Sequence, residues 1–155
     1  TIYGYIDFPN NVDVSLATNW DASAMTGEVI LADVLAMKQA SIDNYYYGPW
    51  VLYIPTGYET VLDDDFKAES DKSIRQRILE IANITDIRVA DKLTANNVLL
   101  VQMTSDVTRL VEGLGITTVQ WDSDGGLQVN FKVMAIWIPQ IRSDQSGNCG
   151  VVHLA

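Results

Sequence analysis

The sequence predicts an α+β domain in which helices pack around a central mixed sheet and a long β-hairpin lies near the C-terminus. The first observation is the run of five β-prone residues from Trp50 to Ile54, which predicts a strand covered on both faces. The second is a helical periodicity between residues 26 and 43. The third is an alternating segment, residues 127–139, that follows a glycine-containing turn.

Length, charge and cysteine content limit the class of protein. The chain has 155 residues, 48% of them hydrophobic, which is enough for one core and short for two independent domains. Twenty acidic and ten basic residues give a net charge of −10, which disfavours direct binding to nucleic acid or to anionic membranes. The single Cys149 excludes an internal disulfide, and no segment approaches the roughly 18 consecutive apolar residues of a membrane helix. We therefore expect a single domain over residues 1–155.

The N-terminal part of the chain carries weaker signals. The segment from Thr1 to Phe8 alternates loosely and predicts a short strand, which ends in a turn at Pro9. Residues 12–20 predict a weak second strand or an extended loop. Because the chain begins without an initiator methionine or a signal sequence, we expect a fragment or a processed product.

The longest helical pattern runs from Thr26, the expected N-cap, to Asp43. Its larger apolar residues fall on one arc of the helix. They are Ile30, Leu31, Val34, Leu35, Met37 and Ile42. The opposite side carries Ala32, Ala36 and Ala40, which form a low surface that lets another backbone approach closely.

The predicted central strand is bounded on both sides. Gly48 and Pro49 stop the segment before it, and Pro55 ends strand pairing because it has no N–H to donate. Thr56 and Glu59 then show the Thr-x-x-Glu spacing of a capping box, which predicts a helix that begins at Thr56.

After this helix, a run of acidic residues is followed directly by basic residues. An acidic loop over residues 63–71 leads into basic residues, and Ser73 is the expected N-cap of a further helix with an isoleucine stripe. We hypothesise that the acidic loop of one copy faces the basic residues of a neighbouring copy. The alternative is a solvated loop before an ordinary exposed helix, because surface ion pairs are usually weak. The candidate subunit-interface residues are Asp63, Asp64, Asp65, Lys72, Arg75 and Arg77.

The sequence after residue 83 predicts mainly β-strands. Residues 84–90 and 97–103 predict two strands, and residues 108–121 continue in β-prone sequence with Gly113 and Gly115 at bulges or turns. After the turn at residues 122–126, the strand from Leu127 has polar alternate positions at first and apolar ones later. We therefore expect it to begin half-exposed, to end covered on both faces, and to stop at Pro139. Residues 150–154 predict a short closing strand.

From Thr26 to Ala155, the order of these elements resembles the C-terminal half of tailed-phage major capsid proteins, the Hong Kong 97 capsid fold that encapsulin shells share. The segments that carry the resemblance are the helix ending at Asp43, the run from Gly48 to Thr56, the helix from Ile74 to Ala82, the Ile87 strand with its Asp91-Lys92 turn, the run from Asn97 to Val101, and a terminal strand pair, Val129–Pro139 with Gly150–Leu154.

The resemblance implies a structural subunit that self-assembles through pentamers and hexamers into an icosahedral phage or prophage capsid. Residues 26–155 would form the axial domain with the terminal long strands, and residues 1–20 a strand segment from the peripheral part. Its partners would be copies of itself and other capsid or cargo proteins, with no cofactor and no enzymatic activity. Its location would be the virion and, during assembly, the cytoplasm of the bacterial host. An encapsulin-type nanocompartment shell is the alternative within the same fold.

The sequence contains few residues that could serve as catalytic or metal-binding groups. His153 is the only histidine, and in a regular strand Cys149 would lie about 13 Å away from it, beyond hydrogen-bond reach. We expect His153 to pack in or on a terminal strand and Cys149 to be buried as a small hydrophobic residue. Glu59 and Asp63 are spaced as paired carboxylates, but capping explains Glu59 more simply. The run of three aspartates lacks the alternating ligands of an EF-hand loop.

A second class of function stays open at this point, namely a small acidic hydrolase or binding domain with a cleft near Tyr45 to Trp50. The three consecutive tyrosines with Trp50 would then form a ligand platform. The preferred interpretation is an amphipathic rim, with the rings in the core and the hydroxyls in water.

Overall fold

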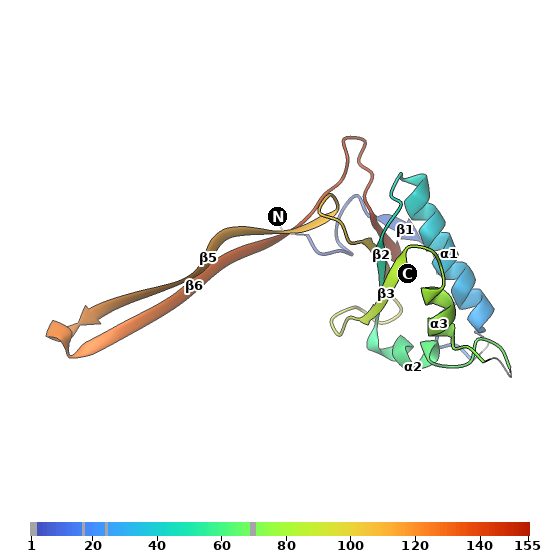
Figure 1. Cartoon of the computed structure of the whole chain (residues 1–155), viewed down its shortest axis with the longest axis horizontal. Helices are drawn as coiled ribbons and strands as arrows, with labels where there is room; N and C mark the ends of the chain where they lie inside the picture. Colours follow the sequence, from blue (N-terminus) through green and yellow to red (C-terminus); the bar gives the residue numbers. More distant parts are fainter. Residues whose placement is uncertain (1–2, 17, 24, 69–70) are drawn as a thin grey trace.

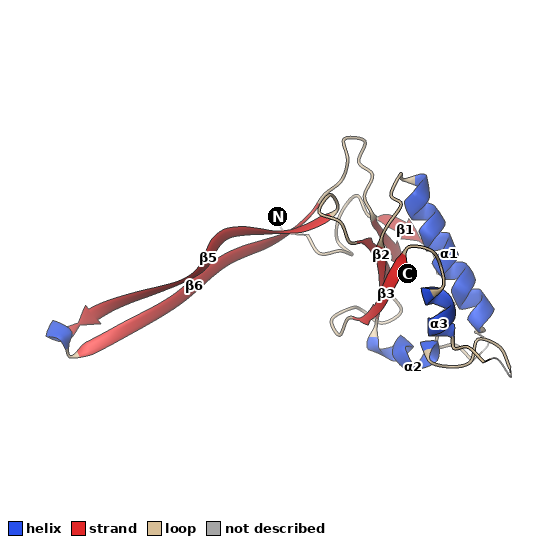
Figure 2. Cartoon of the chain, in the orientation of Figure 1, coloured by secondary structure: helices blue, strands red, loops and turns tan. Residues whose placement is uncertain are grey.

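The computed structural model describes residues 3–16, 18–23, 25–68 and 71–155, which form a mixed α/β body and a projecting β-hairpin (Figures 1 and 2). The helices are α1 (Gly27–Asp43), α2 (Glu59–Leu62) and α3 (Ile74–Leu79), with 3₁₀ turns η1 (Thr56–Tyr58) and η2 (Asp124–Gly126). The strands are β1 (Val12–Val14), β2 (Trp50–Ile54), β3 (Ile84–Val89), β4 (Val98–Gln102), β5 (Thr108–Ser123), β6 (Gln128–Ile141) and β7 (Val151–Leu154). The predicted mixed sheet with flanking helices and a long hairpin is confirmed.

The body is built on a five-stranded sheet in the order β1-β7-β4-β2-β3. The two outer pairs, β1 with β7 and β2 with β3, are parallel, whereas β4 is antiparallel to both of its neighbours. The strand predicted at Trp50 to Ile54 is β2, which lies between β3 and β4. Since β2 pairs on both edges and its faces are covered, nearly all of its residues are buried, as its apolar run requires.

The main core lies between α1 and one face of the sheet. Residues Gly27, Ile30, Val34, Met37 and Ser41 form the buried stripe of α1, which recurs at the three-to-four-residue spacing of a helix face. Helix α1 packs on β1 and β7, and α3 packs on β3. Leu35, predicted to belong to this face, is instead 46% exposed. The helix forms the outer layer of the body, so only its sheet-facing stripe is covered.

A smaller core covers the opposite face of the sheet. Alternation along β4 directs Leu100 to the α1 side, whereas Leu99 and Val101 face the second cluster with Cys149 and Val151. The N-terminal segment packs there through Tyr5, Ile6 and Phe8. The predicted burial of Cys149 is confirmed.

The predicted strand from Thr1 to Phe8 is wrong over its described residues. Residues 5–7 form a turn, and residues 1–2 lie outside the described part of the chain. Adjacent Tyr5 and Ile6 both contact the second cluster. A regular strand would have directed successive side chains to opposite faces, so their packing requires a turn. The weak signal at residues 12–20 corresponds to β1, and the described residues after it, 15–16 and 18–20, belong to no helix or strand.

The predicted capping box at Thr56 and Glu59 is also wrong. The helical segment after β2 begins with the η1 turn, whose first residue is Thr56 and whose N-cap is Pro55. The Pro55 carbonyl accepts a hydrogen bond from the Tyr58 amide at 3.1 Å, and Thr56 makes no side-chain cap. A capping box does form at Ser73, the predicted cap of α3, where the hydroxyl accepts from the Gln76 amide at 3.3 Å. Helix α3 ends at Leu79, before the predicted end.

Three expectations about the C-terminal strands need correction. Strand β6 does not become covered at its end, because Ile136 and Ile138 are exposed. It continues through Pro139 to Ile141, since a proline without an N–H is tolerated where a strand has a free edge. Strands β6 and β7 do not pair, because β7 belongs to the five-stranded sheet and β6 pairs with β5. The predicted bulges at Gly113 and Gly115 are confirmed by register shifts around Leu114.

Candidate functional site

The β5–β6 hairpin is the candidate functional site because it carries most of the exposed apolar surface. Among the described residues, twelve of the nineteen exposed large hydrophobic side chains lie within residues 108–141. The hairpin extends away from the body, and its strands pack chiefly against each other (Figure 1). An isolated two-stranded hairpin is marginally stable in water, and apolar surface of this extent marks a site of protein contact.

Both faces of the hairpin carry apolar side chains, although the β5 partners on the first face, such as Gln120 and Asp122, are polar. The register pairs Trp137 with Glu112 on one face and Ile138 with Val111 on the other, because directly paired residues share a face. Alternation along β6 places Val129, Phe131, Val133, Ala135 and Trp137 on the first face, as predicted. The second face carries Met134, Ile136 and Ile138. A partner on one side would therefore leave a second apolar face available.

The tip of the hairpin is a tight turn with acidic and apolar side chains. Asp124, Gly125 and Gly126 have φ values of 52°, 69° and 91°, and this left-handed backbone is the reason for two consecutive glycines. Leu127 follows and is 88% exposed. Together with Asp122 on β5, these residues, 122–127, are called the tip.

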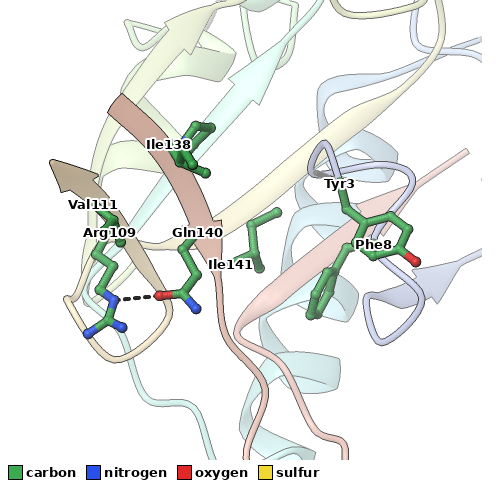
Figure 3. Close-up of a pocket in the computed structure, with 8 residues that line it drawn as sticks. Tyr3, Phe8, Arg109, Val111, Ile138, Gln140 and Ile141 are labelled. Atoms are coloured by element: carbon green, nitrogen blue, oxygen red, sulfur yellow. Dashed lines mark hydrogen bonds between the residues drawn. The ribbon is translucent and has the colours of Figure 1, made fainter. Parts of the chain in front are cut away.

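A cleft of about 480 Å³ lies at the other end of the hairpin (Figure 3). This base cleft is lined by Tyr3, Phe8, Arg109, Val111, Ile138, Pro139, Gln140 and Ile141. Tyr3 and Phe8 come from the N-terminal segment and meet edge to face, with ring centroids 6.3 Å apart. On the hairpin side, Arg109 Nε donates a hydrogen bond to Gln140 Oε1 at 2.6 Å. The cleft combines an apolar lining with one oriented guanidinium.

The acidic and basic residues predicted as an interface lie close together within one chain. Arg75 Nε lies 2.7 Å from Asp63 Oδ1, and a terminal nitrogen of Arg75 lies 3.7 Å from Glu59. The Asp64 carboxylate oxygen Oδ1 accepts a hydrogen bond from the backbone N–H of Asp65 at 2.9 Å. Sequence reasoning missed these pairs because Asp63 and Arg75 lie on different elements. A pairing between copies stays a prediction.

The other basic residues of this group face a carboxylate that sequence reasoning did not consider. Lys72 and Arg77 both form ion pairs with Glu80, the latter at 3.1 Å. The hydrogen bond from Lys72 is the main cause that lowers the pKa of Glu80 below its ordinary value. These side chains are largely exposed, so each pair adds little to stability.

His153 and Cys149 do not meet. His153 Nδ1 lies 3.0 Å from Asp13 Oδ1, and its Nε2 lies 2.5 Å from Asn97 Oδ1. Cys149 Sγ lies 3.4 Å from the Arg142 carbonyl oxygen, and burial raises the pKa of its thiol. The imidazole thus joins β1, β7 and the segment before β4, which is a packing role within the sheet.

The tyrosine cluster does not form one surface with Trp50. Tyr45 and Tyr47 are exposed, whereas Trp50 is buried and donates its indole N–H to Ser41. Tyr46 donates its hydroxyl hydrogen to the Asn148 carbonyl at 3.0 Å. The rings therefore do not combine with Trp50 into a ligand platform.

Over residues 3–16, 18–23, 25–68 and 71–155, no group of three or more His, Cys, Asp and Glu side chains is arranged to hold a metal ion. Within the same part of the chain, no helix has the length and apolar character needed to span a membrane.

Comparisons with known proteins identify a family and several solved structures of similar fold. A family of unknown function (DUF6260) matches residues 1–154. The solved virus-like particle from Pyrococcus furiosus has a similar fold, with a TM-score of 0.72 and 21% sequence identity. The match covers 97% of this chain and 58% of the particle chain, so this chain spans less than two thirds of that protein. No curated protein matches the sequence.

Proposed function

The chain belongs to the family of unknown function DUF6260, and from its fold and its projecting hairpin we propose that it is part of a structural subunit of a closed protein shell. The observation that carries the proposal is the hairpin, because both of its faces carry apolar side chains that are exposed in the single chain. Shell assembly would cover them with neighbouring subunits. The similarity to the virus-like particle from Pyrococcus furiosus supports the same role.

The physical argument rests on what an exposed apolar ribbon requires. The two strands of the hairpin bury little apolar surface against the body. Packing against another protein surface would therefore stabilise the hairpin. A structural protein with many neighbours supplies such cover on both faces. The side chains that would be covered include Phe131 and Val133, which are 65% and 66% exposed.

Within this role, we favour a phage or prophage capsid subunit that assembles through pentamers and hexamers, present in the virion and in the host cytoplasm during assembly. An encapsulin-type compartment is the alternative. The function would be structural, without catalysis. The content of purified particles distinguishes the two: nucleic acid supports the capsid, and a protein cargo supports the compartment.

The test compares the complete gene product with a variant that lacks the hairpin. The Arg142 amide donates to the Val107 carbonyl at 2.8 Å, so residues 107 and 142 already lie side by side. Residues 108–141 can therefore be replaced by Asn-Gly, which favours a tight hairpin turn. Circular dichroism and thermal unfolding would show whether the body of the variant remains folded.

We expect uniform closed particles of the complete protein in negative-stain electron microscopy, and dispersed subunits of the folded hairpin-less variant. Particles from the variant would refute the role of the hairpin. Dispersed monomers of the unaltered protein under all assembly conditions would refute the shell itself.

A further inference from the structure

We propose that the tip of the β5–β6 hairpin of one subunit docks into the base cleft of a neighbouring copy, so that subunits contact each other head to tail. This inference rests on the proposed shell function and deepens it by naming the two surfaces that meet. Four observations carry it: the character of the cleft, the character of the tip, the distance between them, and the like charge of two tips.

The base cleft combines apolar side chains with the exposed guanidinium of Arg109. Arg109 is bonded through Nε to Gln140 and forms no ion pair with any described residue. Figure 3 shows its guanidinium on the side of Gln140 opposite Tyr3 and Phe8. Val111, Ile138 and the aromatic rings of the N-terminal segment supply the apolar lining. The volume of about 480 Å³ falls within the usual range of binding pockets.

The tip offers the complementary groups. Leu127 is the most exposed large hydrophobic side chain of the described residues, at 88%. Asp122 and Asp124 flank the same turn and have no ion-pair partner among the described residues. A leucine with nearby carboxylates is complementary to a cleft that combines apolar side chains with the exposed guanidinium of Arg109. The overall charge of −10 repels an acidic tip from most of a neighbour's surface, so Arg109 also sets where the tip can settle.

The tip and the cleft lie at opposite ends of one hairpin. Strand β5 runs from Thr108 to Ser123, and at about 3.3 Å per residue it separates the two ends by roughly 50 Å. The two surfaces therefore meet only between copies. Contact between different patches of identical subunits propagates head to tail and produces rings when the rotation closes. Contact between two tips is disfavoured because each carries two carboxylates.

The first test is a charge exchange in the complete gene product. One variant carries Arg109→Glu, a second carries Asp122→Lys with Asp124→Asn, and a third combines all three substitutions. Asparagine at position 124 keeps a residue that tolerates the left-handed backbone there. Lys92→Glu is the matched control for Arg109→Glu, because it makes the same charge change at an exposed position outside the cleft and the tip.

We expect the first two variants to need a subunit concentration at least about tenfold higher to assemble, a shift that corresponds to about 1.4 kcal/mol. The combined variant should assemble at a subunit concentration within about threefold of that of the unaltered protein. Lys92→Glu should assemble at the same concentration as the unaltered protein. Light scattering measures the subunit concentration at the midpoint of assembly, and circular dichroism verifies that each variant is folded. Failure of the combined variant to recover would overturn the pairing of tip and cleft.

The second test traps the contact. Subunits with Leu127→Cys are mixed with subunits with Ile138→Cys, and assembled particles are oxidised. The native Cys149 is buried and should not react. A disulfide-linked dimer that forms only in the mixture supports the head-to-tail contact. A dimer from Leu127→Cys alone would show that tips meet each other and would overturn it.

The outcomes separate this inference from the function on which it rests. Particles that assemble normally in all charge variants and show no linked dimer would refute the tip contact and leave the shell function intact. The tip would then not be the occupant of the base cleft. If the unaltered complete protein forms no particles, the shell function fails, and the head-to-tail contact fails with it.

Discussion

The indole nitrogen of Trp50 donates a hydrogen bond to the hydroxyl of Ser41 at 3.0 Å, and both side chains are buried. This bond joins the first residue of β2 to the last turn of α1. It explains why a serine interrupts the buried stripe of that helix, where the other residues are apolar or glycine. The Ser41 hydroxyl donates its hydrogen to the Tyr46 carbonyl at 3.3 Å, which also orders the segment after the helix.

We predict that Ser41→Ala lowers the free energy of unfolding by about 1–3 kcal/mol, because the buried indole N–H loses its acceptor. Urea unfolding followed by tryptophan fluorescence measures the change. The control is Gln39→Ala on the exposed face of α1, which should change stability by less than about 0.5 kcal/mol. Equal effects of the two substitutions would show that the bond adds nothing.

A second prediction concerns the thiol of Cys149. Burial raises its pKa above the ordinary value of 9.0, so the reactive thiolate is scarce in the folded protein. Thiol reagents at pH 8 should label the native chain far more slowly than the urea-unfolded chain. Because the folded pKa is the higher one, the contribution of the neutral thiol to stability is full below pH 9.0 and is lost as the pH rises through the raised folded value. Rapid labelling of the native chain at pH 8 would contradict its burial.

Two glycines provide a matched pair for a third prediction. A Cβ at Gly27 would lie 2.6 Å from the Phe66 carbonyl oxygen, whereas a Cβ at Gly57 would meet nothing within 4 Å. Gly27→Ala should therefore destabilise the chain by about 1–3 kcal/mol through overpacking. Gly57→Ala should be neutral or stabilising by up to about 1 kcal/mol, because it restricts the unfolded chain. Thermal unfolding of both variants compares them, and equal melting temperatures would refute the close approach of α1 to Phe66.

The elements that local sequence determines were predictable, and those that depend on distant contacts were not. Five consecutive apolar residues at β2 require cover on both faces wherever the strand lies. Thr56 matched a capping pattern, yet the turn starts from Pro55 because the chain must leave β2 there. The pairing of Asp63 with Arg75 depends on how α2 and α3 pack, which their spacing in the sequence does not reveal.

The hairpin shows a different limit of sequence reasoning. Apolar residues on both faces of β6 predict burial, and the residues Met134, Ile136 and Ile138 do carry that pattern. The pattern is the same whether the cover comes from the same chain or from another copy. In the 155-residue chain these faces are open, and this disagreement between pattern and exposure is the reason for the proposed contact between subunits. The sequence pattern alone therefore predicts that these faces are covered, and only the exposure in the structure marks the hairpin as a candidate site.

The last prediction separates the stability of the chain from its assembly. Phe131 is 65% exposed on the hairpin, whereas Leu100 is fully buried in the sheet. In the 155-residue chain, Phe131→Ser should change the free energy of unfolding of the body by less than about 0.5 kcal/mol, and Leu100→Ala should lower it by about 2–5 kcal/mol. In the complete gene product, Phe131→Ser should nonetheless reduce the yield of particles, because in the proposed shell a neighbouring subunit covers the ring. Chemical denaturation and electron microscopy of the same variants measure the two effects. A loss of more than about 1 kcal/mol for Phe131→Ser in the dilute chain would mean that the hairpin packs against its own body, and its exposed faces would then no longer support assembly.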